Sequence, residues 1–179
     1  MIILGVDPGT LFTGYAVIDN SAGRLKILDC DVIKNPSANS LPLRLKLIYD
    51  TLVKVINKFK PDEFAIETAF YSKNVQSTLK IGHARGVSIL AAVNKQIPTT
   101  EYSPKEVKKS VVGVGSASKE QVRYMVCQIL GIKSLKGTLD VSDALAVALC
   151  HNNKLLNYHT KNQNWKDYIE QNPKKVKFL

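Results

Sequence analysis

The stretch MIILGVDPGTLFTGYAVID, residues 1–19, decides the fold class of this chain. An unbroken apolar run predicts a buried strand over residues 2–7, and a second apolar run predicts a strand over 14–18. Between them, Asp7-Pro8-Gly9 is typical of a tight turn, where an aspartate accepts backbone hydrogen bonds. A core strand that ends on a carboxylate nevertheless needs explaining, because burying an unpaired carboxylate is unfavourable. Asp7 is therefore either a turn residue or a group with a chemical role.

The rest of the chain alternates strand and helix patterns. Residues 25–33 extend the opening pair into an antiparallel meander, and Ser40 is a candidate N-cap for the helix that follows. The elements predicted after the meander are helix 42–59, strand 63–67, helix 74–95, strand 99–102, and helices 103–112, 118–130 and 140–153. Because the strands come early and alternate with helices later, we expect an α/β fold with a mixed sheet.

Length and composition indicate one globular domain followed by a polar tail. A chain of 179 residues, 45% apolar and 22% charged, suits a single domain with one sizeable core. We expect a body over residues 1–154 and a basic C-terminal tail over 155–179. The tail is expected to be a solvated segment, to add phosphate contacts, or to pack Trp165, Tyr168 and Phe178 back on the body.

The charge balance points to an anionic partner. Lys and Arg outnumber Asp and Glu by 25 to 15, and the net charge is +10. Such a field attracts polyanions, nucleic acid above all, although many basic proteins only stay soluble in this way.

The apolar runs and the cysteines of the sequence indicate the cellular location of the protein. No stretch reaches the roughly 18 apolar residues that a membrane span needs, and residues 1–6 lack the basic start of a signal peptide. Cys30, Cys127 and Cys150 are widely spaced and odd in number, so they indicate neither a disulfide framework nor a zinc motif. We expect buried thiols in a reducing cytosol, hence a cytoplasmic protein without a membrane partner.

Four carboxylates are candidates for a shared site. Asp7 and Glu67 end two predicted strands, and ligand crevices of α/β sheets form at the carboxyl ends of strands. Asp140 and Asp143 are three residues apart on a predicted helix and share a face. Convergence of four acids requires cations, and Mg²⁺ prefers such hard oxygen ligands. The alternatives are a turn aspartate, an exposed strand end, and an N-cap with an acid in the first helical turn.

Five separated motifs carry a family resemblance: ILGVDPGTLFTGYAVID, FAIETAFYSKN, KIGHARGV, VKKSVVGVGSASKEQV and DVSDALAVALCH. In order and spacing they resemble RuvC-type Holliday-junction resolvases, from Met1 to about His151. The resemblance implies a ribonuclease-H-like fold, a mixed five-stranded sheet flanked by helices. It also implies a homodimeric, magnesium-dependent endonuclease that resolves four-way DNA junctions during recombination and repair.

The resemblance also implies roles for individual residues. The catalytic metal ligands would be Asp7, Glu67, Asp140 and Asp143, with two Mg²⁺ per site and Mn²⁺ as a substitute. Lys108 and Lys119 would act near the scissile phosphate, and Phe70 would be the aromatic wedge that stacks on a base. Weaker candidates for contacts with the DNA backbone are Lys73, Arg85 and Lys109. Without the resemblance, Phe70 would be a loop side chain tucked into the core, and each lysine a solvated surface residue.

Partners follow from the same resemblance. They are four-way junction DNA, a second copy of the chain and a branch-migration motor complex. The stripe Val75, Leu79, His83, Val87 and Leu90 would include the dimer interface, whereas its periodicity alone predicts a core face. His83 stands where many family members have Gln, and we interpret it as a core or interface residue rather than a ligand.

Other functions are compatible with parts of the pattern. A ribonuclease H or another branched-DNA nuclease would share the fold and the carboxylates, and a non-catalytic junction-binding module would share the positive charge. The stretch from Asp7 to Gly14 also looks like the first phosphate loop of the actin and sugar-kinase superfamily. Those proteins need two such domains, which 179 residues do not supply.

Overall fold

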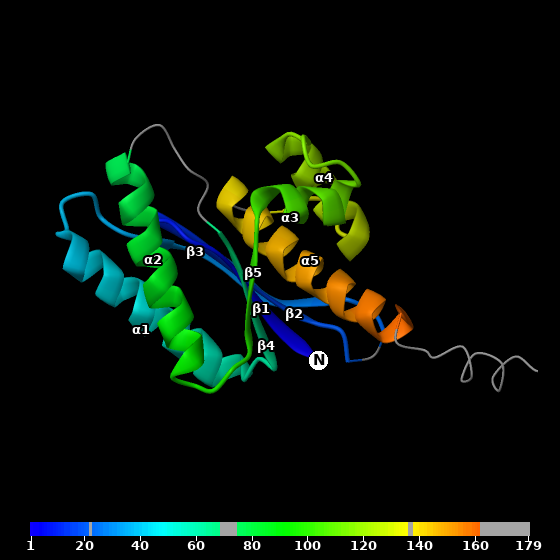
Figure 1. Cartoon of the computed structure of the whole chain (residues 1–179), viewed down its shortest axis with the longest axis horizontal. Coiled ribbons are helices and arrows are strands. Elements are labelled where there is room, and N and C mark those ends of the chain that lie inside the picture. Colours follow the sequence, from blue (N-terminus) through cyan, green and yellow to red (C-terminus); the bar gives the residue numbers. More distant parts are fainter. Residues whose placement is uncertain (22, 69–74, 136–137, 162–179) are drawn as a thin grey trace, which may run out of the picture.

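A mixed sheet with helices on both faces makes up the fold (Figure 1). The computed structural model describes residues 1–21, 23–68, 75–135 and 138–161, the stretch 157–161 by its backbone alone. The strands are β1 (Ile2–Asp7), β2 (Phe12–Asp19), β3 (Lys26–Lys34), β4 (Glu63–Glu67) and β5 (Thr99–Tyr102). The helices are α1 (Leu41–Phe59), α2 (Val75–Val93), α3 (Pro104–Val112), α4 (Lys119–Leu130) and α5 (Leu139–Lys161).

The topology brings the ends of two parallel strands together. The sheet order is β3-β2-β1-β4-β5, with β3, β2 and β1 antiparallel and with β1, β4 and β5 parallel. Asp7 ends β1 opposite Gly14 of β2, and Glu67 ends β4 opposite Tyr102 of β5. This arrangement confirms the predicted meander and the mixed five-stranded sheet of the ribonuclease-H-like class.

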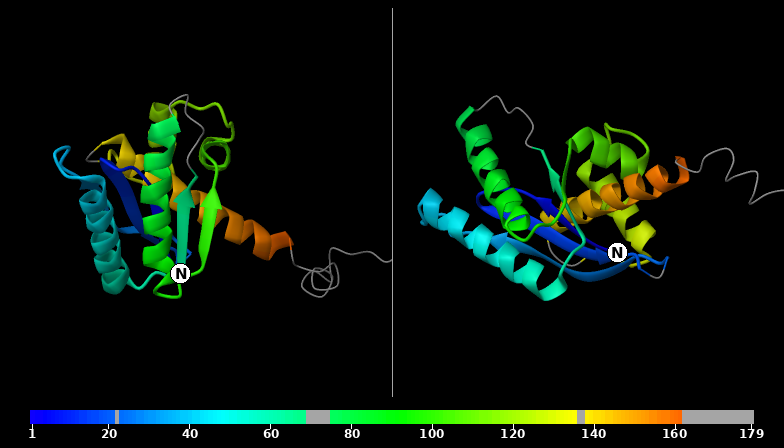
Figure 2. Two further views of the ribbon diagram at one scale, coloured as in Figure 1. Left: turned by 60° about the vertical axis from the view of Figure 1, so that its left-hand side comes forward. Right: turned by 60° about the horizontal axis from the view of Figure 1, so that its bottom comes forward.

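Two cores explain why β1 is apolar throughout. Leu4 and Val6 pack with Ile48 and Leu52 of α1 on one face of the sheet. Ile3 packs on the other face, in a core formed mainly by α3, α4 and α5. Figure 2 shows α1 and α2 on one side of the sheet and α5 on the other. A strand covered on both faces has no polar side to show, so its residues form a continuous apolar run.

Two glycines let α5 lie directly against the sheet. A Cβ on Gly5 would come within 2.5 Å of the carbonyl oxygen of Ala144, and one on Gly14 would overlap the carbonyl of Asp140. Any side chain at these positions would push the helix outward. The close approach places the first turns of α5 beside the end of β1, where Asp7 lies.

Helix starts follow their capping residues. The Ser103 side chain accepts a hydrogen bond from the backbone N–H of Glu106, and the Glu106 side chain in turn accepts from that of Ser103. Ser118 and Gln121 form the same capping box at the start of α4. Ser40 precedes α1 without a side-chain cap bond. All three lie where the sequence predicted helix starts.

Several predicted boundaries and faces were wrong. Helix α5 continues to Lys161, beyond the predicted end at Asn153, because nothing between them breaks a helix. The stripe on α2 is not a core face, since Val75, Leu79, His83 and Leu90 are exposed. The buried residues of α2 are instead Ala84, Ser88, Ala91 and Ala92. The division into body 1–154 and tail 155–179 stays a prediction, and residues 162–179 lie outside the described residues.

The structure also bears on the predictions about membrane spans and cysteines. None of the helices in the described part of the chain is long and apolar enough to cross a bilayer. The three cysteines are free, with Cys127 and Cys150 buried as expected and Cys30 half-buried.

Candidate active site

Three of the four predicted carboxylates line one cavity together with two of the predicted lysines. Asp7 and Glu67 enter it from the ends of β1 and β4, and Asp143 enters from α5. Lys108 of α3 and Lys119 at the start of α4 line it as well. The cavity measures about 160 Å³, and its other lining residues are Pro104, Val107, Val122 and Ala146. Five separate elements of the α/β fold therefore deliver charged groups to one cavity.

Asp140 lies beside this cluster rather than in the cavity lining. Its carboxylate accepts a hydrogen bond from the Thr138 hydroxyl at 2.7 Å. Its charge still acts on the site, since it raises the pKa of Asp7. The spacing of three residues predicted a face shared with Asp143, and the structure places Asp140 outside the cavity lining, where Thr138 binds it.

Burial and mutual repulsion disfavour the ionised form of the carboxylates. Burial raises the pKa of Asp7 to about 7, and the charge of Asp143 adds to the rise while Lys119 opposes it. Burial likewise raises the pKa of Glu67 to about 8, reinforced by Asp7 and Asp143 and opposed by the two lysines. Near neutral pH these acids therefore hold protons unless a cation takes their place.

Lys119 supplies one positive charge to the cluster. Its ammonium donates a hydrogen bond to Asp143 Oδ2 at 2.7 Å. Burial lowers the pKa of Lys119, but the bond to Asp143 and the charges of Asp7 and Asp140 outweigh this effect, so the pKa rises. Lys119 thus stays charged and compensates part of the acidic excess.

The donor chemistry of the site fits a hard divalent cation. Asp7, Glu67 and Asp143 bring carboxylates to one small cavity, and carboxylate oxygens are the ligands that Mg²⁺ prefers. Among the described residues, no three His, Cys, Asp or Glu side chains are close enough together to hold an ion as they stand. The ammonium of Lys119, bound to Asp143, provides the compensating charge in this arrangement.

The turn after Asp7 is fixed by a residue that sequence reasoning left out. Thr13 is fully buried, and its hydroxyl donates a hydrogen bond to the carbonyl oxygen of Gly9 at 2.5 Å. The bond closes the loop between β1 and β2 and so fixes the backbone that follows Asp7. In the sequence, the Thr and Gly residues that recur after Asp7 were the signal that could have indicated this closed loop.

The remaining predicted site residues lie elsewhere. Phe70 and Lys73 fall outside the described residues. Arg85 of α2 forms an ion pair with Glu101 of β5 through one guanidinium nitrogen, and its buried Nε has no hydrogen-bond partner in the described part of the chain. Lys109 is exposed and lines a separate groove of about 510 Å³ between α3 and α5. That groove is larger than the carboxylate cavity, but its one acid, Glu106, is already bonded to Ser103 and Lys154.

Comparisons with known proteins agree with the motifs. The family model "Crossover junction endodeoxyribonuclease RuvC" matches residues 3–151. The crossover junction endodeoxyribonuclease RuvC of Chloroherpeton thalassium is 48% identical, over 98% of this chain and 99% of that protein. Its counterpart from Salinibacter ruber is 45% identical, over the same shares of 98% and 99%. The solved structure of T. thermophilus RuvC in complex with Holliday junction substrate has a TM-score of 0.80 and 31% identity, over 87% of this chain and 94% of that one.

The matched region contains every described element of the sheet and all the carboxylates and lysines of the cavity. The resemblance predicted from the five motifs is therefore confirmed. The chain belongs to the RuvC family of crossover junction endodeoxyribonucleases.

Proposed function

We propose that this protein is a structure-selective endonuclease that resolves four-way DNA junctions by hydrolysing phosphodiester bonds in two opposing strands. The observation that carries the proposal is one cavity lined by Asp7, Glu67, Asp143, Lys108 and Lys119. In this cavity, buried acids with raised pKa values lie beside two cationic side chains. The cations suit a reaction in which negative charge develops on a phosphate. The net charge of +10 would attract the junction itself.

The residues that would hold Mg²⁺ are Asp7, Glu67 and Asp143, with Asp140 at the edge of the set. Bound Mg²⁺, two ions per site with Mn²⁺ as a substitute, would supply the positive charge that activates a water and stabilises the leaving oxygen. The raised pKa values of Asp7 and Glu67 support this assignment, because a divalent ion removes the repulsion that causes part of the rise.

The lysines have a separate task. Lys108 and Lys119 would neutralise charge on the pentavalent phosphorus, and Glu67 would also orient the attacking water. The products would carry a 5′-phosphate and a 3′-hydroxyl. Phe70, Lys73, Arg85 and Lys109 are proposed DNA contacts on the resemblance alone, and so is the branch-migration motor as a partner.

A homodimer would place one site on each strand. The exposed stripe of α2 supports this arrangement, since Val75 and Leu79 are 66% and 59% exposed and Leu90 and Val93 are 50% and 52% exposed. Gly82 and Gly86 on the same helix have open space beside them, which permits close approach of a second helix. A two-fold dimer would match the symmetry of the junction.

Light scattering of the protein and of a Leu79→Glu variant tests the dimer. We expect a dimer for the native chain and a monomer for the variant. A monomeric native chain would contradict the proposal that one dimer makes both cuts.

The reaction is tested by cleavage of a labelled mobile four-way junction with and without Mg²⁺. A linear duplex and an RNA–DNA hybrid of the same sequence serve as controls. We expect Mg²⁺-dependent paired nicks in the junction alone. Cleavage of the hybrid would indicate a ribonuclease H, and binding without cleavage under any divalent ion would indicate a non-catalytic module. A cytoplasmic location stays a prediction from the sequence.

A further inference from the structure

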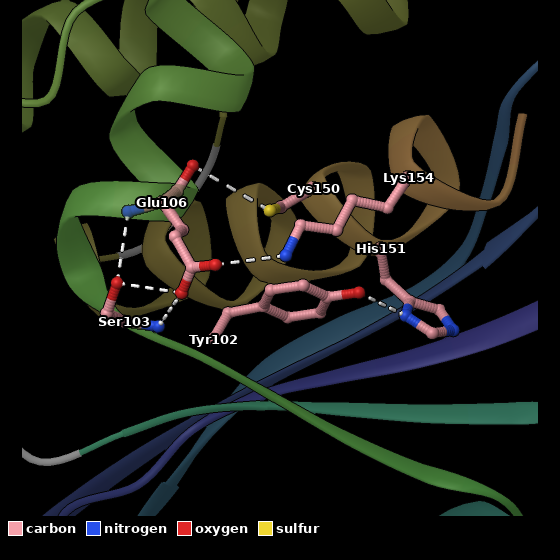
Figure 3. A network of polar contacts seen from close by, with 6 residues as sticks. All are labelled: Tyr102, Ser103, Glu106, Cys150, His151 and Lys154. Carbon is pink, nitrogen blue, oxygen red and sulfur yellow. Dashed lines mark hydrogen bonds and ion pairs between the residues drawn. The ribbon is translucent and has the colours of Figure 1, made fainter. Parts of the chain in front are cut away.

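A second polar network lies on α5, away from the carboxylate cavity (Figure 3). Its centre is a hydrogen bond of 2.7 Å between the Tyr102 hydroxyl and Nδ1 of His151. Tyr102 ends β5 and His151 lies on α5, and their exposed fractions are 1% and 2%. Because both groups lose hydration on folding, the bond between them is stronger than it would be in water, and its loss would leave buried polar groups unpaired.

The surroundings decide which partner donates. Nε2 of His151 lies 3.4 Å from Glu63 Oε2 and has no hydrogen-bond partner in the described part of the chain. A carboxylate favours a proton on the nitrogen that faces it, which leaves Nδ1 as an acceptor. Burial lowers the pKa of His151 and the charge of Glu63 opposes this effect, and the net lowering favours the neutral ring. The Tyr102 hydroxyl therefore donates to His151.

The same network fixes the first turn of α3 to α5. Lys154 donates to Glu106 Oε1 at 3.0 Å, and its ammonium lies 4.4 Å from the centre of the Tyr102 ring. Cys150 Sγ lies 3.8 Å from the carbonyl oxygen of Glu106. Glu106 is also half of the capping box with Ser103, as Figure 3 shows. Cys150 and Lys154 of α5 thus contact the first turn of α3, and His151 contacts Tyr102 at the end of the strand that leads into it.

This anchored turn leads directly into the cavity. The backbone N–H of Thr68 donates to the carbonyl oxygen of Tyr102 at 2.8 Å, next to Glu67. Lys108 follows Glu106 on α3 and lines the cavity. Asp143 lies about two turns before His151 on α5. The Tyr102–His151 bond therefore joins the strand end beside Glu67 to the helix that carries Asp143.

We propose that Tyr102 and His151 are positioning residues of the reaction, which hold α3 against α5 and thereby hold Lys108 at the scissile phosphate. The inference rests on the proposed function. Neither side chain lines the carboxylate cavity. Tyr102 directly precedes Ser103, the N-cap of α3, so the two side chains act on the reaction through the helix that carries Lys108. Small displacements of a charged group near a reacting phosphate have large effects on rate, up to about 100-fold for 1 Å.

The test compares Tyr102→Phe with a matched control. Tyr102→Phe removes one hydroxyl and leaves the ring. Tyr49→Phe also removes one hydrogen bond, which the Tyr49 hydroxyl of α1 accepts at 3.0 Å from the side chain of Asn94, the residue after α2. We expect Tyr102→Phe to bind a four-way junction normally and to cleave it about 10-fold more slowly in single turnovers. Tyr49→Phe should cleave at the native rate.

Coupling to Lys108 separates positioning from general weakening of the fold. In a Lys108→Met background, Tyr102→Phe should cause no further loss of rate, because the group that it positions is already gone. His151→Gln keeps an acceptor and a donor and should retain more activity than His151→Leu. Independent, multiplying losses in the double variant, or a native rate for Tyr102→Phe, would overturn the inference.

Amide hydrogen exchange gives a readout that does not depend on cleavage. In Tyr102→Phe we expect faster exchange in α3 and unchanged exchange in α1 and α2. If the native protein cleaves no junction, the proposed function fails, while exchange still shows whether Tyr102 holds α3. Unchanged exchange in α3 would overturn the inference in either case.

Discussion

Two polar clusters lie about two turns apart along α5, and they differ in how their charges are satisfied. Around Asp143, three acids share a cavity with Lys119 and Lys108, and the pKa values of Asp7 and Glu67 are raised to about 7 and about 8. Around His151, Tyr102 and Glu106 have hydrogen-bond partners within the protein. Hydrogen bonds to Ser103 and Lys154 lower the pKa of Glu106 to about 2.

The difference separates groups kept for chemistry from groups kept for position. An acid whose ionised form is disfavoured in the fold is poised to accept a cation or a proton. An acid whose ionised form is fully bonded, such as Glu106, holds elements together. The same helix therefore carries a strained cluster near its start, where Asp143 lies. About two turns further on it carries a cluster in which Tyr102 and Glu106 are hydrogen-bonded, while Nε2 of His151 has no such partner among the described residues.

The largest expected effect comes from removing one acid of the strained cluster. Asp7→Asn keeps the size of the side chain and loses the charge, so we expect junction cleavage to fall by about 1,000-fold or more while junction binding persists. Single-turnover cleavage and a gel-shift titration measure the two properties. Cleavage near the native rate would show that Asp7 is only a turn residue.

The next effect concerns the packing that brings α5 to the sheet. Gly14→Ala would place a methyl group against the carbonyl of Asp140, and we expect the free energy of unfolding to fall by about 3 kcal/mol. Gly86→Ala is the control, because nothing lies within 4 Å of its added Cβ and alanine favours a helix by about 0.5–1 kcal/mol. Urea denaturation compares them, and equal stabilities would refute the close-contact argument.

The convergence of Asp7 and Glu67 was predictable, whereas the exact approach of α5 was not. The carboxyl ends of parallel strands share an edge whatever packs beside them, so two strand-ending acids must meet. Helix spacing alone placed Asp140 and Asp143 on one face, but the contact at Gly14 decides that Asp143 lines the cavity and Asp140 lies at its side.

The stripe on α2 shows a second limit of prediction. Periodicity identifies an apolar face such as the one that includes Val75 and Leu79, but it does not say whether the chain's own core covers that face. Here the small residues Ala84 and Ala91 are buried and the larger ones are exposed. The Tyr102–His151 bond could not be predicted from the sequence either, because it joins residues 49 positions apart through tertiary packing.

A smaller effect is expected from the lysine inside the strained cluster. Lys119 lowers the pKa values of Asp7 and Glu67, so Lys119→Met should raise both further and slow cleavage about 10- to 100-fold at pH 7. Part of the rate should return at higher pH, where the acids ionise. Lys109→Met, on the separate groove, should alter only the salt dependence of binding. A loss in Lys119→Met that is equal at every pH would indicate a phosphate contact alone.

The smallest effect is on stability. An acid with a raised pKa binds its proton more tightly in the folded state, so ionising Asp7 lowers stability as pH rises from about 4 through about 7. Without divalent ions, Asp7→Asn should be more stable than the native protein at about pH 8.5, with the difference vanishing near pH 4. Thermal melts in chelator measure this. A variant less stable at pH 8.5 would contradict the assigned strain.

Mn²⁺ binding to the full chain at pH 6 and pH 8, followed by electron paramagnetic resonance, tests the central claim most directly. Binding must displace protons from Asp7 and Glu67, so the affinity should be higher at pH 8 than at pH 6 and should be lost in Asp7→Asn. Binding that is equally tight at both pH values, or that survives Asp7→Asn unchanged, would show that the strained carboxylates are not the metal site.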